Sequence, residues 1–248
     1  NSWTAQYTVN SGDTAGEIGF TVDYSSASSS TSGPQVTSAT DGKSVNVILP
    51  TSINVFVTTV TSPGLQLGDD IDGKTADEWF GLSVALSNDG NIMASGAPLT
   101  HNSSDVQVGA ARIYQRDESN TTIAPIGWTQ LGTDIYGIGN DERFGQGISI
   151  NGDGSIVAIG AYINDENDAN AGIVRVYQRD TNAAIGWTQL GTSIFGEDAS
   201  DQLGNTNSIS LNDAGNIIAV SSNKHNNSNG QIRVFEYSGG SWSQIGNN

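Results

Sequence analysis

A five-residue motif that recurs along the chain constrains the fold more than any other feature of the sequence. Residues 128–132 and 187–191 both read Trp-Thr-Gln-Leu-Gly. Residues 242–246 are a close copy, and residues 65–68 keep only the Gln-Leu-Gly end. Copies spaced at a steady interval of roughly 60 residues indicate a repeat protein in which each copy contributes one structural unit.

Other segments recur in the same order within each copy. Two apolar runs flank a turn rich in Asn, Asp and Gly, at residues 88–91, 151–154 and 212–215. Such turns join the strands of a hairpin because Gly and Asn tolerate positive φ. A segment with the alternation of a β-strand follows each hairpin. We therefore predict an all-β chain with three units of four short strands, at about residues 65–132, 133–191 and 192–248.

Two of these segments carry a family resemblance. Phe80-Gly81 followed by Gly96-Ala97-Pro98 resembles the FG-GAP repeat of integrin α-chain propellers and of many secreted microbial surface proteins. The resemblance covers residues 65–248, and in the third copy Leu203-Gly204 replaces Phe-Gly. It implies a β-propeller-like domain of four-stranded units. We expect the three units to surround a pseudo-threefold axis, with residues 65–67 as an additional edge strand.

The first part of the chain does not share the repeat, and Thr-Ser-Pro-Gly at residues 61–64 is the expected domain boundary. Alternating apolar residues predict about five strands in this part. Residues 2–5, 12–14 and 40–45 are similar to the C-terminal half of a bacterial Ig-like domain. A full Ig-like sandwich has about seven strands, so we predict an incomplete Ig-like domain at residues 11–62.

An incomplete sandwich exposes a strand edge that can pair with another chain. The resemblance therefore implies donor-strand exchange, in which residues 1–10 of one copy complete the sandwich of another. The donor side chains would be Trp3, Ala5, Tyr7 and Val9. The acceptor core would consist of Ile18, Phe20, Val22, Val45 and Val47. The alternative is that the N-terminal strand folds back in cis onto its own chain.

Composition excludes several classes of partner and site. The formal net charge is −17, which argues against nucleic acids and anionic membranes because both bind basic patches. The absence of cysteine removes disulfides, thiol catalysis and cysteine-bound zinc. No apolar run approaches the roughly 20 residues of a membrane-spanning helix. The chain starts at Asn without Met, so we expect a mature extracellular product from which a leader has been removed.

Candidate sites in the repeats have mostly structural interpretations. Arg112, Arg175 and Arg233 occupy equivalent positions, which predicts repeated pairing with acidic loops, and the repeated Trp residues are expected to pack between strands. His101 and His225 occupy unrelated positions, so we expect neither a metal ligand nor a catalytic base. Acidic loops at residues 69–70, 141–142, 165–168 and 197–198 are expected to be solvated, with Ca²⁺ as the alternative. The possible glycosylation sites are Asn102, Asn120 and Asn226.

The sequence contains no phosphate-binding loop, nucleophile elbow or catalytic triad, so we expect a non-enzyme. Two functions fit. The first is a structural subunit of an extracellular, pilus-like filament, in which copies of the chain polymerise by donor-strand exchange. The second is a fragment of an adhesin whose propeller-like loops bind a glycan or a protein.

Overall fold

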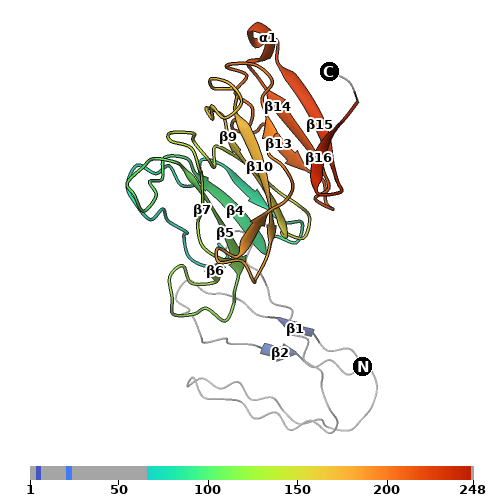
Figure 1. Ribbon diagram of the computed structural model, residues 1–248. Coiled ribbons are helices and arrows are strands. Elements are labelled where there is room, and N and C mark those ends of the chain that lie inside the picture. The colour runs from blue at the N-terminus through green and yellow to red at the C-terminus, as the bar shows by residue number, and fades with distance from the viewer. Residues whose placement is uncertain (1–3, 7–20, 24–65, 247–248) are drawn as a thin grey trace, which may run out of the picture. The chain divides into compact units, whose positions relative to one another are not determined.

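The computed structural model describes residues 4–6, 21–23 and 66–246 (Figure 1). The chain divides into two parts, residues 1–62 and 63–248, which are described separately below. In the first part, β1 (Thr4–Gln6) pairs antiparallel with β2 (Thr21–Asp23). The register places Ala5 opposite Val22.

The second part contains three antiparallel sheets that follow the three sequence repeats, called unit 1, unit 2 and unit 3. Unit 1 has the order β3-β4-β5-β6, made of β3 (Val84–Leu86), β4 (Ile92–Ala97), β5 (Ala110–Arg116) and β6 (Trp128–Gln130). Unit 2 has the order β8-β9-β10-β11, made of β8 (Gly147–Ile150), β9 (Ile156–Ala161), β10 (Ile173–Arg179) and β11 (Trp187–Gln189). Unit 3 has the order β13-β14-β15-β16, made of β13 (Ile209–Leu211), β14 (Ile217–Ser222), β15 (Gln231–Ser238) and β16 (Ser241–Ile245).

Two short strands link one unit to the next. β7 (Ile135–Tyr136) adds to β5, and β12 (Ile194–Phe195) adds to β10. The described helix, α1 (His225–Ser228), has four residues. In the described ranges no helix has the length and apolar character needed to span a bilayer. The all-β prediction is confirmed, and the three repeats form three antiparallel sheets of four to five strands.

The hairpin turns lie at equivalent positions in the three units. Gly90, Gly154 and Gly215 have φ values of 71°, 75° and 72°, a region that side chains with a Cβ rarely occupy. Each glycine donates its backbone N–H to the carbonyl three residues earlier, in Ser87, Asn151 and Asn212 respectively. The first turn therefore starts at Ser87, one residue before the predicted start.

A tryptophan in the fourth strand of each unit contacts the end of the preceding repeat. Its indole Nε1–H donates to a leucine carbonyl oxygen at 2.8 to 2.9 Å. The pairs are Trp128 with Leu67, Trp187 with Leu131, and Trp242 with Leu190. Gln66 and Leu67 lie outside any strand, so the predicted edge strand at residues 65–67 is wrong for these two residues. Leu67 instead supplies the carbonyl that a preceding repeat would supply.

The hydrophobic core lies between successive units. One cluster joins unit 1 residues such as Ile113 to unit 2 residues such as Ile150 and Val157. A second cluster joins unit 2 to unit 3 in the same way. Strand β8 packs against β3 and β4, and β13 packs against β8 and β9. Figure 1 shows unit 2 between the other two.

The pseudo-threefold arrangement that we expected is wrong. A threefold arrangement requires a third interface between unit 3 and unit 1. In the described part of the chain, β13 and β3 form no packing comparable to that of β8 with its two neighbours. The units are therefore connected in series, and units 1 and 3 each keep one face without a neighbouring unit.

Two glycines allow the backbones of neighbouring units to approach closely. An ideal Cβ on Gly96 of unit 1 would lie 1.9 Å from the carbonyl oxygen of Gly145 of unit 2. A Cβ on Gly160 would lie 2.1 Å from the carbonyl oxygen of Gly204 of unit 3. Both distances are far below van der Waals contact, so only glycine permits this approach. The strand registers place Ser221 at the equivalent position of unit 3.

Candidate functional site

Unit 1 contains a buried ion-pair cluster centred on Arg112, which is 1% exposed. The Arg112 guanidinium donates from Nη1 and Nη2 to the two carboxylate oxygens of Glu78, at 2.7 and 2.8 Å. Its Nε donates to Asp134 at 2.9 Å, and the Lys74 ammonium donates to the other Asp134 oxygen at 2.6 Å. Arg112 therefore pairs with acidic residues, but Glu78 and Asp134 lie outside the acidic loop predicted for this repeat, residues 69–70.

The electrostatics of this cluster favour the charged forms. Burial alone would raise the pKa of Glu78, but its hydrogen bonds with Arg112 and with the Lys74 backbone N–H outweigh that effect and lower it. Burial likewise opposes ionisation of Asp134, and hydrogen bonds from Lys74, Gln130 and Arg112 lower its pKa. Burial would lower the pKa of Arg112, whereas its carboxylate partners raise it. A carboxylate held ionised in this way is a poor general acid.

Unit 2 repeats the cluster with different partners. Arg175, also 1% exposed, donates from Nη1 to Glu142 at 3.3 Å and from Nη2 to Glu166. The Asn164 side chain donates to the second Glu142 oxygen. In both units the guanidinium lies over the ring of the Phe-Gly motif, with centroid distances of 5.2 Å for Phe80 and 5.8 Å for Phe144.

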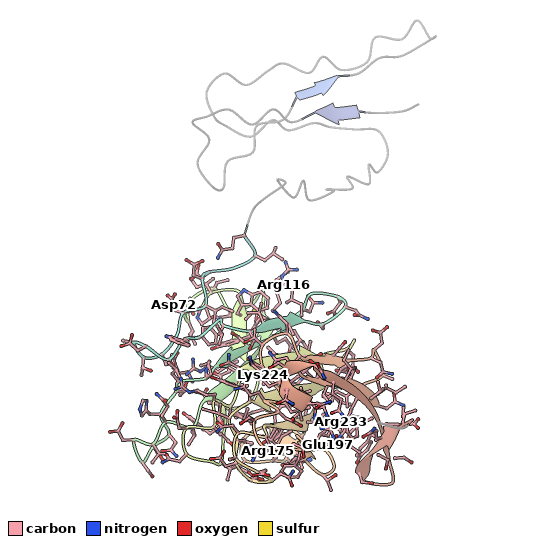
Figure 2. All side chains as sticks on the ribbon, turned by 90° about the horizontal axis from the view of Figure 1, so that it is seen from above. Asp72, Arg116, Arg175, Glu197, Lys224 and Arg233 are labelled. Atoms are coloured by element: carbon pink, nitrogen blue, oxygen red, sulfur yellow. The ribbon has the colours of Figure 1, made fainter. Side chains whose placement is uncertain are left out.

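In unit 3 both the buried acid and the arginine have different partners from those in units 1 and 2. Asp201 accepts the backbone N–H of the residue four positions earlier, as Glu78 and Glu142 do, but its side chain is one methylene shorter. Arg233 Nη1 instead lies 3.5 Å from Glu197 Oε1, and Figure 2 labels both residues. Its Nη2 donates to the carbonyl oxygen of Phe195. Its Nε is buried and has no hydrogen-bond partner among the described residues, and burial lowers the pKa of the Arg233 guanidinium. Unit 3 therefore holds its arginine less completely than units 1 and 2.

The carboxylate of Asp201 contacts a histidine instead of the arginine. His225 Nδ1 lies 3.0 Å from Asp201 Oδ1 and 3.9 Å from Asp198 Oδ2. Within residues 66–246, these three side chains form the one group of acidic and histidine ligands close enough to hold a metal ion. Sequence reasoning did not anticipate this group, because His225 lies in the loop between β14 and β15. The equivalent loops of units 1 and 2 place Thr100 and Asn164 against the buried acids Glu78 and Glu142 instead. Two carboxylates and one imidazole offer fewer ligands than the six to eight oxygens that Ca²⁺ takes.

The three glycosylation sequons differ in the use of the asparagine side chain. Asn120 Nδ2 donates to the carbonyls of Ile123, Pro125 and Trp128, so a glycan there would remove hydrogen bonds that hold the loop. Asn102 uses its Oδ1 to accept two backbone N–H groups. Asn226 is exposed. The structure therefore separates Asn120 from the other two sites.

The open end of unit 1 presents apolar side chains. Val84 and Leu86 of β3 are 64% and 59% exposed. A hollow of about 360 Å³ lies beside them, lined by residues that include Phe80, Met93 and Trp128. We call this surface the front face. In unit 2 the equivalent residue of Leu86 is Ile150, which is 8% exposed because unit 1 covers it.

The open end of unit 3 is exposed in a complementary way. Ile232 of β15 is 74% exposed, whereas the equivalent residues Ala111 and Val174 are fully buried between units. Ala219 and Val234 share this surface, since they are equivalent to Ala94 and Ile113 of unit 1. We call this surface the rear face.

Of the side chains predicted for strand exchange, the structure brings one donor and one acceptor residue together, Ala5 and Val22. The others lie outside the described residues: Trp3, Tyr7, Val9, Ile18, Phe20, Val45 and Val47. No protein-family model matches the chain, and no curated protein matches it.

Proposed function

We propose that this protein is a structural subunit of an extracellular filament in which copies join by exchanging the N-terminal strand. The observation that carries the proposal is the ladder between β1 and β2, which pairs the donor residue Ala5 with the acceptor residue Val22. In a single chain this ladder closes in cis. If β1 of one copy paired with β2 of another, the same strand pairing would form between two chains. Domain swapping requires this equivalence, because an identical element is exchanged between copies.

The other features of the chain agree with a structural role. The buried charged cluster of unit 1 pairs Glu78 and Asp134 with Arg112 and lowers the pKa of both carboxyl groups, which suits stability rather than acid–base chemistry. Three repeated units with a shared core give a rigid body to each copy. A filament would then consist of repeat domains linked through the paired N-terminal strands.

The absence of cysteine allows a direct test by disulfide trapping. Residues directly opposite in an antiparallel ladder have Cα atoms about 4.5 or 5.5 Å apart, within the range of a disulfide. One chain carries Ala5→Cys and another carries Val22→Cys. When the two are mixed, exchange in trans predicts an oxidised heterodimer, whereas cis pairing predicts none.

A matched control uses the adjacent residue. Ala5→Cys mixed with Thr21→Cys places the two thiols out of register, on opposite faces of the ladder, and should not cross-link. The double variant Ala5→Cys/Val22→Cys should give covalent multimers under filament-forming conditions. If it gives oxidised monomer alone under every condition in which the protein assembles, strand exchange is not the mechanism of assembly.

A further inference from the structure

We propose that the front face of unit 1 and the rear face of unit 3 are the two halves of a head-to-tail interface between copies of this chain. The inference rests on the proposed filament but concerns a second contact, formed by the repeat domains. The occupant of each face is the opposite face of another copy.

The chain itself shows what such an interface looks like, because it forms it twice. In both internal interfaces, a rear face bearing small and branched residues at three equivalent positions packs against the first strand of the next unit. Those rear residues are Ala94, Ala111 and Ile113 in unit 1, and Ala158, Val174 and Val176 in unit 2. All six are fully buried.

The open rear face keeps the same pattern without a covering unit. Ala219, Ile232 and Val234 stand at the three equivalent positions. Ile232 is 74% exposed, although its equivalents in units 1 and 2 are fully buried. Its apolar surface is therefore in contact with water, and burying that surface against a second copy favours association.

The open front face likewise keeps its apolar side chains. Val84 and Leu86 stand where Ile148 and Ile150 pack against unit 1, and where Ile209 and Leu211 pack against unit 2. A hollow of about 360 Å³ lies beside Val84, lined in part by Phe80 and Met93.

One residue makes the contact between copies weaker than the internal interfaces. Ser221 occupies the position of Gly96 and Gly160, where a Cβ would come within about 2 Å of the incoming carbonyl. The incoming backbone of a second copy would be that of Gly81, which has open space around it. Ser221 therefore holds the second copy slightly away, so we expect the contact between copies to be looser than the two internal ones.

The test uses the full chain with Ala5→Cys/Val22→Cys oxidised within each monomer, so that strand exchange cannot contribute to association. Sedimentation velocity should then show association of this locked chain that depends on concentration. Ile232→Lys should disrupt the rear face of the interface, and Val84→Lys should disrupt the front face. Both side chains are exposed enough for the fold to tolerate the change. Ile138→Lys, at a residue 73% exposed and outside both faces, is the matched control and should associate like the parent.

Two further measurements decide the geometry. Ile232→Lys and Val84→Lys should each be monomeric alone, yet their equimolar mixture should give one-to-one dimers, because each retains the half that the other lacks. Ser221→Gly should tighten association by about tenfold or more, because it removes the atom that prevents close approach. A Val84→Lys monomer together with an Ile232→Lys dimer would overturn the head-to-tail arrangement in favour of front-to-front pairing.

Failure of this proposal differs from failure of the proposed function. If neither the locked parent nor Ser221→Gly associates, the head-to-tail interface does not exist, whatever the cysteine mixing experiment shows. If the locked parent associates but the Ala5→Cys and Val22→Cys chains never cross-link, the interface exists and strand exchange does not.

Discussion

Removing the Glu78 carboxylate should destabilise the repeat domain far more than removing a surface carboxylate. In Glu78→Ala, two guanidinium donors of Arg112 lose their acceptors, and water cannot replace them because Arg112 is 1% exposed. A buried donor without a partner costs about 1 to 3 kcal/mol. Asp134 keeps its bond to Nε, so we expect a loss of about 3 kcal/mol, at the lower end of the range for broken buried ion pairs.

The measurement is urea unfolding followed by the fluorescence of the buried Trp residues. Glu118→Ala is the matched control, because Glu118 pairs with Arg116 at 2.7 Å but its side chain is 79% exposed. Exposed pairs contribute less than about 1 kcal/mol. The variant Glu78→Leu/Arg112→Met should recover much of the loss, since it removes both charges. Equal small losses in Glu78→Ala and Glu118→Ala would refute the assignment of a buried charged cluster.

Three other outcomes follow from the structure. The buried carboxylates of unit 1 have lowered pKa values in the folded state, so they stabilise the fold above their unfolded pKa of about 4, and this stabilisation is lost as the pH falls below it. Thermal melts between pH 5 and pH 2 should show this loss of stability. The loss should be smaller in Glu78→Leu/Arg112→Met. Trp187→Phe should cost about 1 kcal/mol or more through loss of the bond to the Leu131 carbonyl, whereas Trp79→Phe, at a residue 57% exposed, should leave the urea midpoint nearly unchanged. Expression in a host that glycosylates sequons should yield a glycan at Asn226 and none at Asn120, as checked by peptide mass spectrometry.

The sequence predicted those features that depend on local pattern. Alternation and turn composition gave the four strands of each unit, and the repeated glycines required positive φ at equivalent turns. The three equivalent arginines, Arg112, Arg175 and Arg233, were expected to pair with acidic loops because the residues recur together. Each of them does contact a carboxylate.

The features that sequence reasoning missed depend on contacts between distant segments. A pseudo-threefold arrangement was inferred from the number of copies, but closure depends on the rotation between units, which no local pattern encodes. The proximity of Asp201 and His225 depends on the loop between β14 and β15, which places a histidine where units 1 and 2 have Thr100 and Asn164. An alignment of the buried acids of the three units would have marked Asp201 as the exception.

Serial packing also determines how the repeat domain should open. Unit 2 has a neighbour on both sides, and all six residues of β9 are buried. The equivalent strand of unit 3, β14, has three buried residues of six. In arrays where each unit contacts only its neighbours, local opening starts at the ends and reaches the centre last. Amide hydrogens of β9 should therefore exchange most slowly, so that an assembled filament, by covering both ends, would slow exchange chiefly in units 1 and 3.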